Sequence, residues 1–225
     1  MTAAQLAPPR AVVLDLDGTL VDTVQTRIDA WVRTFAEEGI PADQALVSAL
    51  IGSDGRQLAT QVGEAAGTHI DDERAERIDA RSGAIYSELN ASPRLLPGVT
   101  PFLDALDAAV IPWAIGTSSR REQVGPSVAA LRRTSPPRIV DGTAVKLAKP
   151  HPDLLLAAAR VLDTDPAACW CVGDSTWDML AAAAAGMPAV GITAGSAVTA
   201  EQLQEAGASL VLPTVAELIP YLSSG

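Results

Sequence analysis

The sequence is poor in lysine, because its 225 residues include only Lys146 and Lys149 and every other basic side chain is an arginine. Arginine keeps its charge and does not form an imine with a carbonyl compound, so lysine-based covalent chemistry has only these two candidates. Acidic residues outnumber basic ones by 27 to 16, which gives a net charge of −11. Since such a charge repels polyanions, we expect no nucleic-acid partner.

Long apolar runs are missing as well. Although 48% of the residues are hydrophobic, no stretch approaches the roughly 18 apolar residues of a membrane span. The N-terminal stretch MTAAQLAPPR has no apolar segment of the kind found in signal peptides. We therefore expect a cytoplasmic protein with no membrane partner and with enough apolar residues for a sizeable core.

Cysteine is scarce, since Cys169 and Cys171 are the only two. Their C-x-C spacing is not that of a redox C-x-x-C motif, and two sulfurs alone make a poor zinc site. On an extended strand these side chains point to the same side, so we expect two buried thiols. The two histidines, His69 and His151, have no neighbours at metal-ligand spacing and are not proposed as ligands or bases.

Short apolar runs alternate with helical patterns over most of the chain. A strand over 11–16 ends at Asp17-Gly18, and from residue 99 onward helices alternate with further strands before a final helix. Those strands are expected over 113–117, 139–140, 169–172, 189–192 and 208–212. This alternation predicts an α/β fold with a doubly wound parallel sheet, Rossmann-like, covered by helices on both faces.

The segment between the first two strands differs, because it holds helical patterns without any strand-like run. Val24, Ile28, Trp31 and Phe35 recur at helical spacing at its start. We therefore predict an all-helical cap domain over 22–92, inserted into a catalytic core formed by 1–21 and 93–225.

In an open parallel sheet, ligands bind beyond the carboxyl ends of the strands. In DLDGTL, Asp15 and Asp17 face the same side of a strand end, and Gly18 lets backbone amides approach an anion. Asp and Gly are also ordinary turn residues. Thr117 and Ser118 follow the second strand, where hydroxyls bind a phosphate oxygen or simply cap a helix.

Two further motifs can also be interpreted either as part of a binding site or as ordinary structural residues. Lys149 in KLAKPHPD is fixed beside a proline, although a lone lysine is more often on the surface. Asp174 ends the strand of CWCVGD, and Asp178 follows one helical turn later. Carboxylates at a helix start are commonly caps, so neither motif identifies a site alone.

Taken together and in this order, the four motifs resemble the haloacid-dehalogenase-like superfamily, in the subgroup whose helical cap lies between the first and second motifs. The resemblance extends from Val12 through Val190. It implies that Asp15 is a nucleophile that becomes an aspartyl phosphate, and that Asp17 protonates the leaving oxygen and then deprotonates water. Thr117 and Lys149 would bind the transferring group, with Gly18 and Ser118 also contacting substrate.

The same resemblance implies a Mg²⁺ ion. Its ligands would be Asp15, the backbone carbonyl of Asp17 and Asp174, while Asp178 would orient a metal-bound water. A carboxylate cannot approach a phosphate dianion unless charge is cancelled, which the cation and Lys149 would do.

The implied function is a phosphatase acting on a small phosphorylated metabolite, such as a sugar phosphate or phosphoglycolate. Asp17 argues against dehalogenases, which lack a second Asp, and the absence of lysine from 22–92 argues against phosphonoacetaldehyde hydrolases. Beta-phosphoglucomutases remain an alternative, although they usually carry a histidine in the place of Arg27. A non-catalytic phosphate-binding protein is a further alternative.

Arginines of the cap are the candidates for selecting the substrate. Arg56 in IGSDGRQL would grip a second anionic group with its planar fork, or else is a solvent-exposed arginine after a helix break. Arg27 is a weaker candidate for the same role. A run of alternating charges further along is interpreted as a solvated helix face; it contains Glu73, Arg74, Glu76, Arg77, Asp79 and Arg81.

Overall fold

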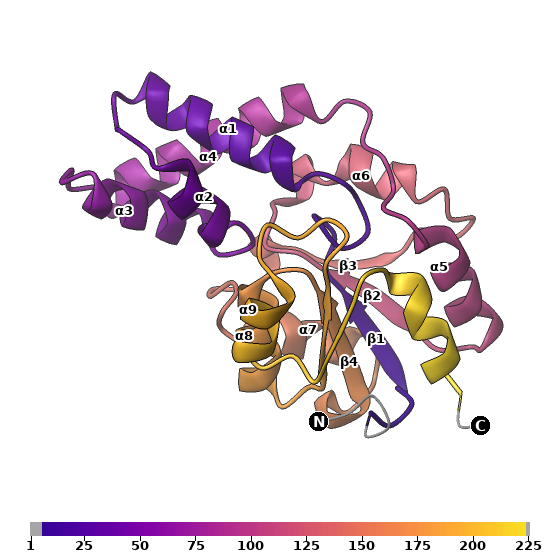
Figure 1. The fold of residues 1–225 in the computed structure, drawn as a ribbon. Helices are drawn as coiled ribbons and strands as arrows, with labels where there is room; N and C mark the ends of the chain where they lie inside the picture. Colours follow the sequence, from indigo (N-terminus) through magenta and orange to yellow (C-terminus); the bar gives the residue numbers. More distant parts are fainter. Residues whose placement is uncertain (1–5, 224–225) are drawn as a thin grey trace.

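The computed structural model describes residues 6–223, so the first five residues of the N-terminal stretch considered above lie outside the described residues. Six strands form one sheet in the order β3-β2-β1-β4-β5-β6 (Figure 1). Every neighbouring pair is parallel, which confirms the predicted α/β fold with a doubly wound parallel sheet. The strands are β1 (Ala11–Leu14), β2 (Trp113–Gly116), β3 (Arg138–Val140), β4 (Cys169–Gly173), β5 (Ala189–Ile192) and β6 (Leu210–Leu212).

Helices cover both faces of this sheet. Along β1, Val12 and Leu14 belong to one buried cluster, whereas Ala11 and Val13 belong to another. Because successive side chains of a strand point to opposite faces, each strand contributes to two cores. The first core is closed by α5 (Val99–Ala108), α6 (Gly125–Ala130) and the 3-10 helix η5 (Val215–Tyr221), and the second by α7 (Asp153–Val161), α8 (Thr176–Ala185) and α9 (Ala200–Glu205).

The cysteines follow the same alternation in β4. Cys169 and Cys171 are buried free thiols on the face of α7 and α8, and Trp170 between them is buried in the opposite core. The prediction of two buried thiols on one side of a strand is confirmed.

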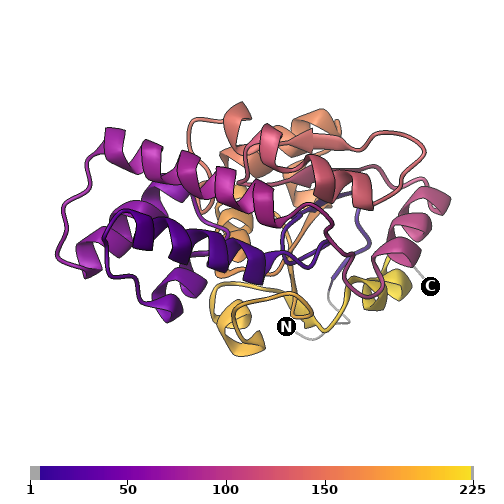
Figure 2. The same ribbon diagram turned by 90° about the horizontal axis from the view of Figure 1, so that it is seen from above.

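Five helices lie between β1 and β2. The last of them, α5, covers the sheet, and the first four pack on one another beyond one end of the sheet (Figures 1 and 2). They are α1 (Val24–Glu37), α2 (Gln44–Leu50), α3 (Gly55–Ala65) and α4 (Asp72–Leu89), and they enclose a hydrophobic cluster of their own. The two segments that connect them to the sheet run side by side, since the Asp22 amide donates to Arg94 O at 2.9 Å and the Leu96 amide donates to Leu20 O at 3.0 Å. The boundaries at 22 and 92 remain a prediction.

Most strand ends lie within one residue of the expected positions, and three elements differ by more than this or in type. β1 ends at Leu14 rather than at residue 16, because the chain enters a turn in which Gly18 has φ +84°. β6 begins at Leu210 rather than at residue 208. The last helix is a 3-10 helix instead of an α-helix; it contains Pro220, which has no amide to donate to an α-helical hydrogen bond. Short 3-10 helices also occur in the loops as η2 (Arg121–Gln123), η3 (Gly142–Ala144) and η4 (Pro166–Ala168).

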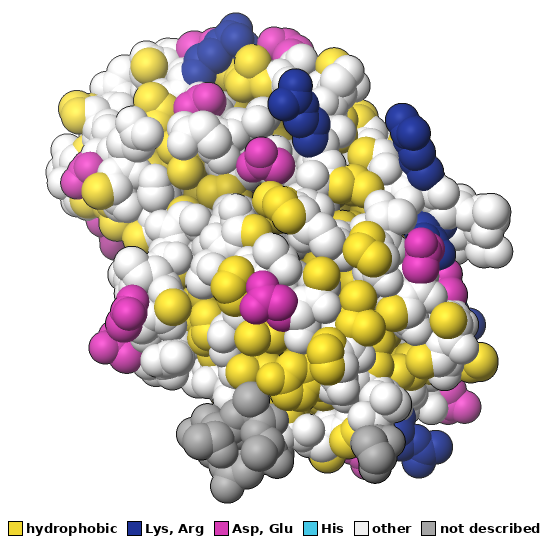
Figure 3. Space-filling view, turned by 45° about the vertical axis from the view of Figure 1, so that its right-hand side comes forward, with side chains coloured by type: hydrophobic (Ala, Val, Ile, Leu, Met, Phe, Trp, Pro, Cys, Tyr) yellow, Lys and Arg dark blue, Asp and Glu magenta, His cyan; other side chains and the backbone are white. Residues whose placement is uncertain are grey.

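Among residues 6–223, no helix is long and apolar enough to cross a membrane. On the face that Figure 3 shows, apolar side chains gather over the lower half of the molecule, and the Lys and Arg side chains are separated from one another. This face therefore presents no continuous basic surface.

Candidate active site

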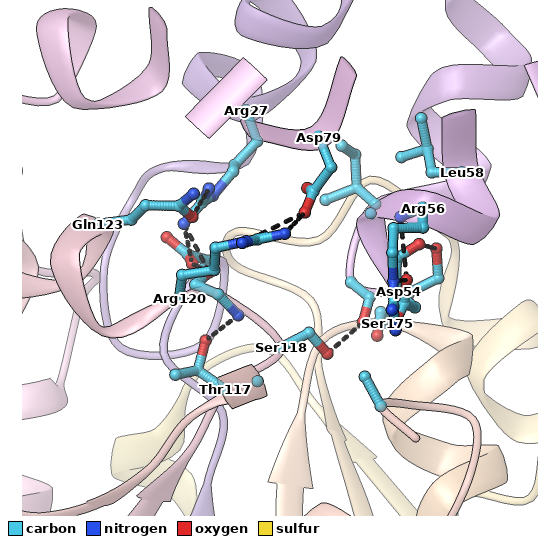
Figure 4. Close-up of a pocket in the computed structure, with 18 of the residues that line it drawn as sticks. Arg27, Asp54, Arg56, Leu58, Asp79, Thr117, Ser118, Arg120, Gln123 and Ser175 are labelled. Atoms are coloured by element: carbon cyan, nitrogen blue, oxygen red, sulfur yellow. Dashed lines mark hydrogen bonds and ion pairs between the residues drawn. The ribbon is translucent and has the colours of Figure 1, made fainter. Parts of the chain in front are cut away.

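The carboxyl ends of β1, β2 and β4 meet beneath the four inserted helices. A cavity of about 460 Å³ lies there, lined from the sheet side by Asp15, Thr117 and Asp174 and from the helix side by residues of α1, α3 and α4 (Figure 4). The topology thus places the strand-end residues singled out by the sequence at one site.

Lys149 is the centre of the charged groups below this cavity. Its side chain is only 1% exposed, and its Nζ donates to Asp15 Oδ1 at 2.5 Å and lies 2.6 Å from Asp178 Oδ1. Burial disfavours the ammonium, but the two carboxylates outweigh it and raise the pKa of Lys149 above its usual value. Lys149 is therefore a buried, charged lysine rather than a surface one.

Three buried carboxylates surround this single ammonium. Asp15, Asp174 and Asp178 each place an oxygen within 4.8 Å of the others. Burial, followed by the charge of Asp178, raises the pKa of Asp15 to about 7 against the opposing effect of Lys149. Burial and the charges of Asp15 and Asp178 raise the pKa of Asp174 well above its usual value. The cluster therefore combines three carboxyl groups with one positive charge, that of Lys149.

A divalent cation that prefers oxygen ligands fits this cluster. Asp178 Oδ1 lies close to the Lys149 ammonium but makes no well-directed hydrogen bond to any described residue, so a buried carboxylate oxygen is available as a ligand. A cation would also offset the repulsion between the three carboxylates.

The two carboxylate oxygens of Asp178 have different partners. Its Oδ2 accepts hydrogen bonds from the amide and the hydroxyl of Ser175, and the Ser175 hydroxyl accepts from the Asp178 amide, which forms a capping box at the start of α8. Its Oδ1 belongs to the acidic cluster. Asp178 therefore caps α8 and also contributes an oxygen to the acidic cluster, while its role toward a metal ion remains a prediction.

Gly18 and Thr19 position Asp174. A Cβ on Gly18 would come within 2.2 Å of Asp174 Oδ2, so only glycine leaves room for that carboxylate. Thr19 Oγ1 donates to Asp174 Oδ1 at 2.9 Å. The Gly18 amide donates to Val21 O, so its predicted contact with substrate remains a prediction.

Asp17 lies outside the acidic cluster and accepts four hydrogen bonds. Arg27 Nη2 and Ser119 Oγ donate to its Oδ2 at 3.0 and 2.8 Å, and Thr23 Oγ1 and Tyr86 OH donate to its Oδ1 at 2.6 and 2.8 Å. Burial raises the pKa of Asp17, but Arg27 and the hydroxyl donors outweigh it, and the pKa lies below its usual value. Asp17 is held as a carboxylate by donors from α1, α4 and the loop after β2.

The hydroxyls after β2 have partners within the protein. Thr117 is buried, and its Oγ1 accepts from the Ser119 amide at 3.1 Å. Ser118 Oγ donates to Gly52 O at 3.0 Å, which connects the sheet to the inserted helices. Both residues line the cavity, and their roles toward a phosphate remain predictions.

The arginines over the cavity are paired with carboxylates (Figure 4). Arg56 is half-exposed and pairs with Asp54 at 2.9 Å, so its role in gripping an anion also remains a prediction. Arg120, which the sequence analysis missed, extends from the loop after β2 to Glu76 at 2.5 Å and to Asp79 at 2.7 Å. Arg120 directly follows Thr117, Ser118 and Ser119 in the sequence, and this position was the feature that could have identified it as a site residue.

The interpretation of α4 as a solvated helix face is wrong for two of its residues. Glu76 and Asp79 line the cavity and bind Arg120, because this turn of the helix faces the sheet. The interpretation holds for Glu73 and Arg77, which form an exposed pair at i and i+4.

Comparisons with known proteins agree with this geometry. A family model described as haloacid dehalogenase-like hydrolase matches residues 9–186. The chain is 31% identical to "Probable phosphatase IndB" of Dickeya dadantii, over 92% of this chain and 91% of that protein. It is 30% identical to the beta-phosphoglucomutase of Bacillus subtilis, over 93% and 91%. It is 33% identical to the phosphoglycolate phosphatase of Pseudomonas putida, over 83% and 70%.

A solved structure is similar over nearly the whole chain. The crystal structure of a hydrolase from Pseudomonas syringae superposes with a TM-score of 0.89 at 32% identity and covers 94% of this chain and 97% of that one. The architecture of sheet and inserted helices is thus shared with a known hydrolase.

The space that Gly18 leaves for Asp174 generates a prediction with a matched control. Gly39 also has a positive φ, but an added Cβ there meets nothing within 4 Å. Gly39→Ala should lower the free energy of unfolding by about 1–2 kcal/mol through backbone strain alone. Gly18→Ala should lower it by clearly more, because the methyl group displaces Asp174. Urea unfolding of both variants measures this, and equal losses would show that the close approach to Asp174 is unimportant.

Proposed function

The chain belongs to the haloacid dehalogenase-like hydrolase family, and on that premise we propose that it is a Mg²⁺-dependent phosphatase that hydrolyses a small phosphomonoester through an aspartyl phosphate. The observation that carries the proposal is the buried cluster of Asp15, Asp174, Asp178 and Lys149 at the strand ends. Three carboxylates and one ammonium suit a metal-assisted transfer of a phosphoryl group.

Asp15 is the proposed nucleophile. One of its carboxylate oxygens attacks phosphorus, the bond between phosphorus and the leaving oxygen breaks, and the phosphoryl group remains on Asp15. Lys149, which donates to Asp15 Oδ1, offsets the negative charge that gathers there. A water molecule then attacks the same phosphorus, which releases inorganic phosphate and restores the Asp15 carboxylate.

Asp17 is the proposed acid and base. In the first step it gives a proton to the leaving oxygen, and in the second it takes a proton from the attacking water. Its four hydrogen-bond donors stabilise the carboxylate, which is the form required in the second step. Before the first step it has to take up a proton, and a hydroxyl among its donors, such as that of Ser119 or Tyr86, can then turn to accept a hydrogen bond from the protonated carboxyl.

Mg²⁺ would be held by Asp15, Asp174, the backbone carbonyl of Asp17 and, directly or through water, Asp178. When bound, it would reduce the repulsion between the Asp15 carboxylate and a phosphate dianion. Thr117, Ser118 and the backbone amides around Gly18 are the proposed contacts of the phosphoryl oxygens. Arg56 is the proposed contact of the leaving part.

A phosphomutase is the second candidate, because the beta-phosphoglucomutase of Bacillus subtilis is 30% identical over nearly the whole chain. A mutase returns the phosphoryl group of the aspartyl phosphate to a sugar, whereas a phosphatase gives it to water. The two functions therefore differ in net release of inorganic phosphate.

Phosphate release from a panel of small phosphomonoesters, with and without Mg²⁺, tests the proposal. The panel includes beta-glucose 1-phosphate with its bisphosphate activator. We expect release that depends on Mg²⁺. Isomerisation of the glucose phosphate without net phosphate release would instead establish the mutase, and inactivity on every compound would favour a phosphate-binding protein.

Asp15→Asn should abolish turnover while it leaves the fold intact, because the neutral amide has nearly the same size but is a poor nucleophile. Turnover by Asp15→Asn is measured with the best substrate of the panel, and folding by circular dichroism. Glu73→Gln, which removes an acidic charge from an exposed position, is the control and should keep full activity. Substantial turnover by pure Asp15→Asn protein would refute the assignment of the nucleophile.

A further inference from the structure

The wall of the cavity that the inserted helices and the loop after β2 form contains several ion pairs. Its charged side chains come from the start of α1, the start of α3, the side of α4 and the loop after β2 (Figure 4). This wall, called here the paired wall, consists of Arg27, Asp54, Arg56, Glu76, Asp79 and Arg120.

Every guanidinium of the paired wall already has a carboxylate partner. Arg27 pairs with Asp17 at 3.0 Å, Arg56 pairs with Asp54 at 2.9 Å, and Arg120 pairs with two carboxylates at 2.5 and 2.7 Å. Three arginines thus face four carboxylates, which are Asp54, Glu76 and Asp79 of the paired wall and Asp17 beside it. Lys146 also lines the cavity, from an exposed position at its rim, and even with its charge the region is only neutral.

An additional anionic group on a substrate would therefore gain no net attraction here. To bind Arg56 or Arg120 it would have to displace Asp54, Glu76 or Asp79, and those carboxylates would then face it as like charges. Displacement of Asp79 is especially unfavourable, because it is largely buried and would lose its hydrogen bonds from Arg120 Nε and Nη2.

A hydroxyl group suits the same wall, because it both donates and accepts. It can donate to a carboxylate oxygen of an ion pair and accept from a guanidinium N–H without separating the two charges. Asp79 binds Arg120 through Oδ2, which leaves its Oδ1 without a hydrogen bond from the residues that the structure describes. Trp31, Ile51 and Leu58 add apolar lining, which suits the C–H faces of a sugar or polyol.

We propose that the substrate is a phosphomonoester of an uncharged, hydroxyl-rich alcohol, a sugar or polyol, and that the pairing of Arg120 with Asp79 and Glu76 selects against leaving groups that carry a carboxylate or a second phosphate. This inference rests on the proposed phosphatase function. It separates this chain from substrates such as phosphoglycolate, in which a carboxylate lies next to the phosphoester.

The test compares kcat/KM for sorbitol 6-phosphate, phosphoglycolate and glucose 1,6-bisphosphate, all with saturating Mg²⁺. The chain should prefer sorbitol 6-phosphate over each of the other two by about tenfold or more, the size of effect that one unfavourable charge contact produces. A preference for phosphoglycolate or for the bisphosphate would overturn the proposal.

Variants test the role of the ion pairs. Asp79→Asn combined with Glu76→Gln frees Arg120, so the ratio of kcat/KM for phosphoglycolate to that for sorbitol 6-phosphate should rise about tenfold. Asp72→Asn combined with Glu73→Gln removes the same two charges from exposed positions of α4 and should leave the ratio unchanged. An unchanged ratio in the Asp79→Asn, Glu76→Gln double variant, or an equal rise in both double variants, would overturn the assignment of specificity to Arg120. The single variant Asp79→Asn gives the same comparison if the double variant does not fold.

Hydrolysis of p-nitrophenyl phosphate distinguishes failure of this proposal from failure of the proposed function. If the chain hydrolyses it with Mg²⁺ but does not prefer the polyol ester, only the leaving-group proposal is wrong. If the chain hydrolyses no ester, the phosphatase function is wrong. Calorimetric affinities of the unmodified chain for sorbitol 6-phosphate and phosphoglycolate, with Mg²⁺, then decide the leaving-group proposal, since tighter binding of phosphoglycolate would overturn it and tighter binding of the polyol ester would support it.

Discussion

A single buried ammonium among three buried carboxylates is the interaction on which the rest of the site depends. Lys149 contacts Asp15 and Asp178 directly, and Asp174 completes the cluster. Carboxylates at this depth are stable only when positive charge compensates them, and one lysine does not compensate three. The excess of negative charge, which together with burial raises the pKa values of Asp15 and Asp174, makes the site suited to a divalent cation.

The fold assembles this cluster from residues far apart in the sequence, and two glycines make it possible. Parallel strands bring the ends of β1 and β4 side by side, so Asp15 and Asp174 meet although 159 positions separate them (174 − 15). Gly18 leaves space for Asp174, and Gly173 leaves space for Asp178, since a Cβ would come within 2.2 and 2.3 Å of those side chains. The glycines of both motifs therefore leave the space that the neighbouring carboxylates occupy.

Much of this arrangement could be predicted from the sequence, because it follows from topology. Apolar runs located the strands, and the rule that ligands bind beyond their carboxyl ends grouped Asp15, Thr117, Lys149 and Asp174 at one edge. The contacts above the cavity could not be predicted in this way. Arg120 meets Asp79 because α4 packs against the segment that follows β2, and no local sequence pattern encodes that packing.

The charges of α4 show why local pattern was insufficient. Glu73 and Arg77 form the i,i+4 pair that a solvated helix face predicts, yet Glu76, which lies between them in the sequence, pairs with Arg120 from the loop after β2. Periodicity gives the spacing of residues on a helix but not the direction in which each side faces. The inserted helices and the segments after the strands together therefore line a cavity that neither part forms alone.

The most direct test of the central claim is thermal unfolding of the unmodified chain and of Asp174→Asn as a function of Mg²⁺ concentration. A ligand that binds only the folded state stabilises it by about 2.7 kcal/mol at 100 times its Kd. We predict that Mg²⁺ raises the Tm of the unmodified chain, and that Asp174→Asn raises the Tm without Mg²⁺ but removes most of the response to it, because the substitution relieves the repulsion that the cation would otherwise offset. Equal responses of the two proteins to Mg²⁺, or a lack of response in the unmodified chain, would contradict the account.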